Sequence, residues 1–204
     1  ETFRLKADID FAKKNNLNNK PVIALLPGSR KQEVQAMLSE MMKVARAFSD
    51  YEFVIAAAPS LDKEFYEKFS IEGFKTIYGH TYDVLNIAHA AIVTSGTATL
   101  ETALFKVPQV VCYRGGKISY FIAKSLVKIK FISLVNLILN RLAVSELIQH
   151  NMNAENISAE LKKIVGNSSK RKRMLIEYDQ LISVLGGKGA SENAAKEIVQ
   201  FLKY

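Results

Sequence analysis

The sequence predicts an α/β fold, a doubly wound, mostly parallel sheet of the Rossmann type with a helical C-terminal tail over about residues 150–204. The first observation behind this is an alternation of short apolar runs with segments of helical periodicity up to residue 114. That order implies parallel strands joined by right-handed crossovers, with helices on both faces. The second observation is that helical periodicity alone continues beyond residue 150. No stretch rich in Pro, Gly or Ser divides the chain, so we expect one domain over residues 1–204.

The elements follow in order from these patterns. Apolar runs bounded by turn residues predict strands at 21–26, 51–59, 74–79, 91–96 and 108–114. Helical spacing of apolar residues predicts helices at 6–16, 31–49, 60–70, 81–90 and 97–107. Ser60 is the expected N-cap of the helix at 60–70. After an apolar stretch interrupted by lysines, "SELIQ" (145–149) is expected to begin the tail, with helices at 153–165 (ending at Gly166), 168–184 and 190–203.

The composition limits the classes of protein to which the chain can belong. A single cysteine, Cys112, excludes a disulfide framework, and no run of 18 uncharged apolar residues is present to span a membrane. The formal net charge of +8 predicts an anionic partner, which can be nucleic acid, nucleotide phosphates or anionic lipid. The chain starts without Met and without a signal peptide, so we expect it to be cut from something longer.

Polar loops follow three of the expected strands, at the edge where open α/β sheets bind ligands. The first loop is "PGSR". Gly28 lets backbone N–H groups approach an anion, the N-terminus of the next helix supplies partial positive charge, and Arg30 can form two parallel hydrogen bonds to a phosphate. The alternative is a plain helix cap, in which Ser29 caps the helix and Arg30 is solvated.

The second loop, "SGTATLE", suits a nucleotide. Ser95 and Gly96 lead into a helix whose free N–H groups, together with the hydroxyls of Thr97 and Thr99, can bind a diphosphate. Glu101 lies about 6 Å further along the helix axis, roughly the distance from a phosphate to the ribose of the same nucleotide. A carboxylate there can accept hydrogen bonds from both ribose hydroxyls. The alternative gives Glu101 only a favourable place in the first turn of the helix.

The third loop and the remaining polar segments carry weaker signals. "CYRGGK" offers Arg114 as a further phosphate ligand, or is only a turn with exposed cations. The three histidines are too scattered to form a metal site, so none is expected. "SSKRKRM" is interpreted as a solvated helix start, and because no signature of a DNA- or RNA-binding module is present, nucleic acid is not an expected partner.

Four motifs, in this order and spacing, resemble lipid-A-disaccharide synthase, a glycosyltransferase of the two-Rossmann-domain (GT-B) type. They are "LLPGSRKQEV", "SGTATLETALFKVPQVVCYR", "FISLVNLI" and "SELIQ". The resemblance covers the chain from about Asp10 to its end. It implies that residues 1–204 are the C-terminal, UDP-sugar-binding half of a GT-B fold, and that an N-terminal acceptor-side domain is absent from this chain.

The resemblance also implies a reaction. Members of this family transfer 2,3-diacylglucosamine from its UDP conjugate to 2,3-diacylglucosamine 1-phosphate, which gives a β-1,6-linked disaccharide 1-phosphate and UDP. By position, Arg30 and Asn136 match residues that matter to catalysis. The expected ligands of the UDP-sugar are Gly28, Ser29, Ser95, Gly96, Thr97, Thr99, Glu101 and Arg114. The family works without metal or cofactor, and its general base belongs to the missing domain, so the fragment alone should be inactive. Val135 stands where the family often has a proline.

Two rival classes fit parts of the sequence. Another GT-B enzyme that uses UDP-GlcNAc, such as the muramyl-peptide GlcNAc transferase or the 2-epimerase, shares the fold but lacks "PGSR" with "SLVN". A non-catalytic anion- or membrane-binding module needs the basic residues but not Glu101. The stretch Lys117–Lys130 can lie on an anionic membrane surface or face the core. The resemblance also implies a cytoplasmic protein, peripheral on the inner membrane of a Gram-negative bacterium. Homo-oligomers stay possible.

Overall fold

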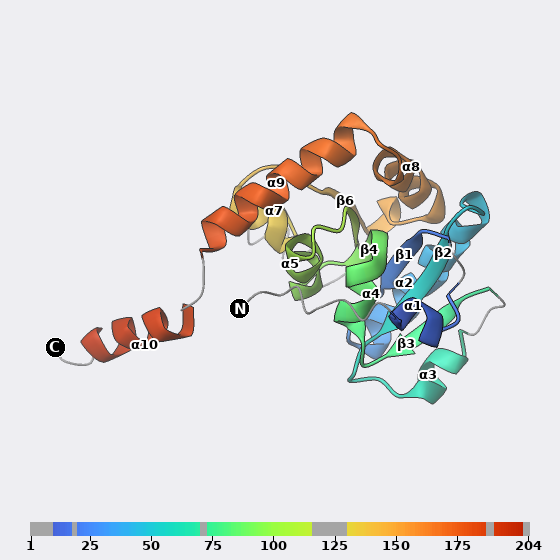
Figure 1. Ribbon diagram of the computed structural model, residues 1–204, viewed down its shortest axis with the longest axis horizontal. Helices are drawn as coiled ribbons and strands as arrows, with labels where there is room; N and C mark the ends of the chain where they lie inside the picture. The colour runs from blue at the N-terminus through green and yellow to red at the C-terminus, as the bar shows by residue number, and fades with distance from the viewer. Residues whose placement is uncertain (1–9, 18–19, 70–72, 116–129, 187–189, 202–204) are drawn as a thin grey trace.

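The computed structural model describes residues 10–17, 20–69, 73–115, 130–186 and 190–201, and these contain a six-stranded sheet with helices on both faces (Figure 1). The strands are β1 (Val22–Leu26), β2 (Glu52–Ala57), β3 (Lys75–Tyr78), β4 (Ala88–Thr94), β5 (Gln109–Tyr113) and β6 (Ser145–Ile148). Every neighbouring pair is parallel, and the strand order is β3-β2-β1-β4-β5-β6. This is the Rossmann order, so the predicted fold class is confirmed.

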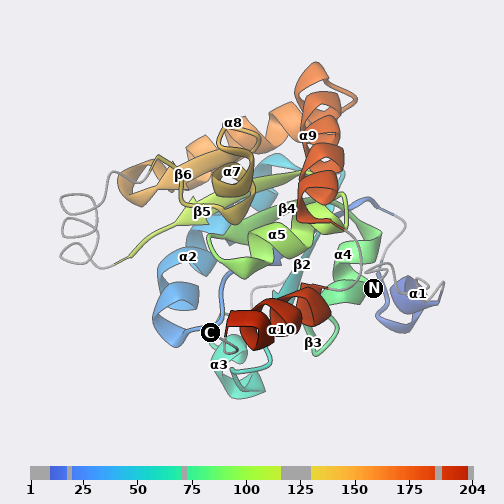
Figure 2. The same ribbon diagram turned by 90° about the vertical axis from the view of Figure 1, so that its left-hand side faces the viewer.

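The helices divide between the two faces of the sheet. They are α1 (Phe11–Lys14), α2 (Lys31–Lys43), α3 (Lys63–Glu67), α4 (Thr81–Ile87), α5 (Thr97–Leu104), α7 (Leu134–Leu139), α8 (Ala154–Val165), α9 (Ser169–Leu185) and α10 (Ala190–Phe201), with 3-10 turns at Val44–Ala47 and Gln149–Asn151. Ile23 and Leu25 pack in one buried cluster with side chains of α2, α8 and α9. Val22 and Ala24 pack in a second cluster with α1 and α4. Helix α8 packs against β5 and β6, and α9 contacts both α8 and α7 on this side of the sheet (Figure 2).

The central strands carry apolar side chains on both faces of the sheet, and helices cover both faces, so these side chains are buried on either side. β1 and β2 are buried along their whole length. A strand that is covered on both faces reads as a continuous apolar run, which is why "VIALL" was recognisable in the sequence. The predicted helices of the C-terminal tail are confirmed by α8, α9 and α10 within one or two residues at most ends.

Three predictions of local structure are wrong. Residues 88–90 were expected to end the helix at 81–90, but they begin β4. Residues 145–148 do not begin the helical tail but form β6, an edge strand whose Ser145 is paired with Val110 and whose Ile148 is paired with Tyr113. A segment of four residues is too short to show strand periodicity, and pairing with β5 decides its structure. Ser60 is not the N-cap of α3, because Asp62 takes that place and accepts a hydrogen bond from the Phe65 N–H at 2.8 Å. Most of the lysine-rich stretch, residues 116–129, lies outside the described residues.

Candidate active site

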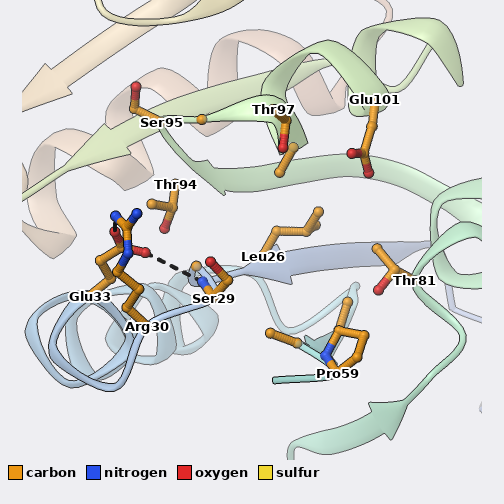
Figure 3. A pocket seen from close by; sticks show the side chains of 15 residues that line it. Leu26, Ser29, Arg30, Glu33, Pro59, Thr81, Thr94, Ser95, Thr97 and Glu101 are labelled. Atoms are coloured by element: carbon orange, nitrogen blue, oxygen red, sulfur yellow. Dashed lines mark hydrogen bonds and ion pairs between the residues drawn. The ribbon is translucent and has the colours of Figure 1, made fainter. Parts of the chain in front are cut away.

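A cavity of about 410 Å³ opens at the carboxyl ends of β1 and β4 (Figure 3). From β1 the chain winds outward to β2 and β3, then returns to β4 on the other side of β1. The loops after β1 and β4 therefore leave the sheet in opposite directions, and the crevice between them is where such sheets bind ligands. The lining residues are Leu26, Gly28, Ser29, Arg30, Glu33, Ala56, Ala58, Pro59, Thr81, Thr94, Ser95, Gly96, Thr97, Ala98 and Glu101.

The loop after β1 presents backbone and a cation to this cavity. Gly28 has φ +113°, a conformation that a residue with a Cβ rarely adopts. Arg30 is the N-cap residue of α2, and no side chain caps the helix there, so the simple capping role considered for Ser29 is wrong. The Arg30 guanidinium is 81% exposed and contacts Glu33, with Nη1 2.9 Å from Oε1. This leaves an accessible cation at the mouth of the cavity.

The loop after β4 brings only part of its predicted ligands to the cavity. Thr97 is exposed, and its side chain points into the cavity in Figure 3. The Ser95 hydroxyl instead donates to the Ile132 carbonyl at 2.7 Å, although Ser95 lines the cavity. Thr99 is fully buried and its hydroxyl donates to the Gly96 carbonyl at 2.8 Å. The expectation that Thr99 binds a diphosphate is therefore not supported, because its hydroxyl is already used within α5.

Glu101 lies where a second cavity of about 370 Å³ adjoins the first, since both cavities are lined by this residue. It is the fifth residue of α5, beyond the first turn, so a helix-dipole role for its carboxylate loses its basis. Burial raises the pKa of Glu101 above its usual value. Among the described residues no hydrogen-bond donor reaches this carboxylate, which leaves both oxygens available to a ligand.

The second cavity extends the site away from the loops after β1 and β4. It is lined by Pro59, Gly79, His80, Thr81, Tyr82, Asp83 and Glu101. His80 is held beside Asp83, with Nδ1 2.9 Å from the carboxylate oxygen Oδ2. His80 therefore lines the second cavity while its ring is held by Asp83. His89 bonds to the Val165 carbonyl and lines neither cavity.

Arg114 lies away from both cavities. Its guanidinium donates to the Ala36 carbonyl at 3.3 Å and to the Met152 carbonyl. These bonds join the end of β5 to α2 and to Met152, two residues before α8. Two of its N–H groups are thus used inside the fold, and Arg114 lines neither cavity, so this position does not support the expectation that Arg114 binds the UDP-sugar.

Asn136 is buried, and its side-chain amide is fully occupied. Its Nδ2 donates to the Val144 carbonyl at 2.9 Å and to Glu146 Oε1 at 2.8 Å. Its Oδ1 accepts from the N–H groups of Ala143 and Val144. Asn136 has no exposed surface. Each donor and acceptor of this side chain is thus used within the protein, and the catalytic role implied by the resemblance stays a prediction.

Glu33 and Glu146 are two carboxylates that the sequence reasoning missed. Glu33 lines the cavity and stands three residues after the N-cap Arg30, a spacing typical of carboxylates that reach back to a helix start. Glu146 accepts hydrogen bonds from the N–H groups of Ile132 and Ser133, from the Ser133 hydroxyl and from Asn136. No local pattern could reveal the role of Glu146, because its partners lie 10 to 14 residues earlier in the chain.

Neither a metal centre nor a membrane-spanning helix is found among the described residues. In the part of the chain that the structure describes, no group of three or more His, Cys, Asp or Glu side chains is arranged to hold a metal ion. Within the same residues, none of the helices combines the length and apolar character that crossing a bilayer requires.

Comparisons with known proteins agree with the geometry. A family model described as "Lipid-A-disaccharide synthetase" matches residues 1–200. Lipid-A-disaccharide synthases of Syntrophus aciditrophicus and Myxococcus xanthus are 40% and 34% identical to the chain over 189 residues. Each match covers 89% of this chain and 49% of the relative, so the chain spans about half the length of these curated relatives.

The fold is shared with glycosyltransferases of more distant sequence. The structure of Phytolacca americana UGT2 complexed with UDP-2fluoro-glucose and pterostilbene superposes with a TM-score of 0.56 at 15% identity. That superposition covers 96% of this chain and 45% of UGT2. The strands of this chain have the Rossmann order, and a crevice lies between its two glycine loops. Because the family model matches residues 1–200, this chain belongs to the lipid-A-disaccharide synthetase family.

Proposed function

We propose that this chain is the UDP-sugar-binding half of a lipid-A-disaccharide synthase. The reaction would transfer 2,3-diacylglucosamine from UDP to the 6-hydroxyl of 2,3-diacylglucosamine 1-phosphate. Family membership and the named activity of the relatives support the reaction class. Because the chain covers about half of those relatives, the acceptor site and the general base would belong to another domain. The 204 residues alone should therefore bind nucleotide without catalysing transfer.

The observation that carries the proposal is the unpaired, half-buried carboxylate of Glu101 between two adjoining cavities. One cavity has the glycine loops at its other end, which suits a diphosphate, and the second offers room for a base near His80. A nucleoside diphosphate has this same order of parts, with the ribose in the middle. Glu101 would accept hydrogen bonds from the ribose hydroxyls, as an acidic residue does in dinucleotide sites.

Arg30 is the proposed stabiliser of the leaving group. When the bond between the sugar and the diphosphate breaks, negative charge grows on the diphosphate oxygens, and a preorganised cation beside them lowers the barrier. The exposed Arg30 guanidinium lies at the cavity mouth, next to the backbone of Gly28 and Ser29. Gly96 and Thr97 would contact the same diphosphate from the N-terminus of α5.

Asn136 is proposed to position the site rather than to contact the substrate. Asn136 donates to Glu146, and Glu146 accepts from the N–H groups of Ile132 and Ser133, which holds the turn there. The Ile132 carbonyl in this turn accepts from the Ser95 hydroxyl. Ser95 precedes the Gly96–Thr97 turn. A chain of hydrogen bonds thus connects the "SLVN" motif to the loop that would bind the diphosphate.

The test is a calorimetric titration of the 204-residue chain with UDP and, separately, with uridine. We expect UDP to bind and uridine to bind much more weakly, because only UDP can use the glycine loops. Absence of UDP binding would remove the proposed assignment of the cavity. Disaccharide formation by this chain alone would contradict the proposal that the acceptor site and the general base belong to another domain.

Peripheral association with an anionic membrane is also proposed, with the cytoplasmic face of the inner membrane as the site. The support is the net charge of +8 and the acylated nature of both substrates. Sedimentation with vesicles of anionic lipid, compared with vesicles of zwitterionic lipid, tests it. Equal partition to both kinds of vesicle would argue against an electrostatic attachment.

A further inference from the structure

Glu33 is a carboxylate inside the cavity that no nucleotide contact requires. It is the third residue of α2, and its side chain turns back over the loop after β1 (Figure 3). Its Oε1 lies 2.9 Å from Arg30 Nη1, and its Oε2 accepts from the Ser29 N–H at 3.3 Å. An anionic group of the protein itself thus occupies the N-terminal end of α2.

The glycine of this loop is needed to make room for the same carboxylate. A Cβ built on Gly28 would lie 2.8 Å from Glu33 Oε2 and 3.1 Å from Glu33 Cβ. The space above Gly28 is therefore filled by the Glu33 side chain. A diphosphate that approached the backbone of Gly28 and Ser29 would need that same space and the same donors.

We propose that Glu33 is an internal stand-in for the diphosphate, which holds Arg30 and the Ser29 N–H in the empty site and is displaced when UDP binds. This inference rests on the proposed function, because it assigns the same cavity to UDP. The Arg30 side of the ion pair is 81% exposed and the Glu33 side 26% exposed. Pairs exposed to this degree are weak, so a change of partner is easy. A diphosphate offers Arg30 and the N–H group more oxygens and more charge than one carboxylate does.

The exchange has a consequence opposite to that of an ordinary ligand residue. Glu33 competes with the diphosphate in the free protein, and its displaced charge lies close to the diphosphate in the complex. Removing the charge of Glu33 should therefore strengthen UDP binding. In the complete enzyme, the returning carboxylate would help to release UDP after transfer, because it competes for the groups that hold the product.

The experiment measures UDP affinity in Glu33→Gln. Glutamine has the same length and keeps an oxygen that can accept from the Ser29 N–H, so the start of α2 should survive the change. We expect the affinity for UDP to rise about threefold to tenfold, at 1.4 kcal/mol for each factor of ten. Uridine, which lacks the diphosphate, should bind with unchanged affinity. On an Arg30→Ala background the gain should shrink, because part of the competition acts through Arg30.

A matched control is available on the same helix. Glu40 also forms a pair three residues along α2, with Oε1 2.6 Å from Lys43 Nζ, and it does not line the cavity. Glu40→Gln changes the net charge by the same amount as Glu33→Gln. Because Glu40 lies outside the cavity, this variant should leave UDP affinity unchanged. The inference is overturned if UDP affinity rises equally in both variants, or if it is unchanged or weaker in Glu33→Gln. In either case, UDP binding by the unaltered chain still supports the proposed function. Failure of the unaltered chain to bind UDP removes both.

Discussion

Replacing Glu101 with glutamine separates a nucleotide-binding role from a structural role for this carboxylate. Glutamine keeps the shape of the side chain but turns one acceptor oxygen into a donor and removes the charge. If both carboxylate oxygens accept from ribose hydroxyls, one hydrogen bond is lost and the other becomes neutral. Hydrogen bonds to charged groups contribute about 1.5–3 kcal/mol each, so the dissociation constant for UDP should rise at least about tenfold.

The stability of the ligand-free protein should not fall in Glu101→Gln, although its affinity for UDP does. Because burial raises the pKa of Glu101, the folded protein binds the proton more tightly than the unfolded chain does. The resulting stabilisation is present at low pH and is lost as the pH rises through the raised pKa, so the neutral-pH fold carries the cost of an ionised, half-buried group. Glutamine has no such cost. The melting temperature of Glu101→Gln at pH 7 should equal or exceed that of the unaltered chain.

Calorimetric titration with UDP and thermal melting of the same samples provide the two readouts. UDP affinity of the unaltered chain should also fall as the pH is lowered through the Glu101 pKa, and the variant should lose this dependence. Glu155→Gln is the matched control, since Glu155 is an exposed carboxylate in the first turn of α8. It should lose about 0.3–1 kcal/mol of stability and no UDP affinity. If Glu101→Gln shows the pattern of the control, the ribose assignment is refuted.

Three further substitutions test other parts of the structure. In an enzyme that contains this chain and an acceptor-binding domain, Arg30→Ala should raise the barrier by about 2–4 kcal/mol, measured as kcat, and a normal turnover would leave Arg30 a solvated residue. Glu146→Gln should lower the free energy of unfolding by about 1–3 kcal/mol, because it sets a donor against the N–H groups that this carboxylate accepts, and denaturant titration would measure it. Burial alone would raise the pKa of Glu160, but hydrogen bonds from Lys163, Lys170 and Ser145 lower it to about 2. Its stabilisation is therefore present above the ordinary pKa of 4.5 and is lost as the pH falls toward 2, so Glu160→Gln should show a smaller loss of stability over that range than the unaltered chain.

The two loops of the cavity were predictable because each follows a strand that is apolar on both faces. β1 and β4 are such strands, and the Rossmann order places their carboxyl ends side by side. The direction of single side chains was not predictable in the same way. Thr99 is two residues after Thr97, which rotates it by about 200° around the helix and turns its hydroxyl away from the cavity. Arg114 turns toward carbonyls of residues that are 78 and 38 positions away, and no local pattern records such partners.

The "SLVN" motif shows how a residue can matter to a site without touching it. A proline before the asparagine would stiffen this turn, yet Val135 is fully buried there and packs in the core. Asn136 is instead held by two donated and two accepted hydrogen bonds, and Ser133 caps α7 by accepting from the Asn136 N–H. Because Glu146 joins this turn to β6, the position of the turn depends on the edge strand as well as on its own sequence. The loss of proline is therefore compatible with an ordered turn, and any effect of Asn136 on UDP binding would have to pass through the Ile132 carbonyl to Ser95.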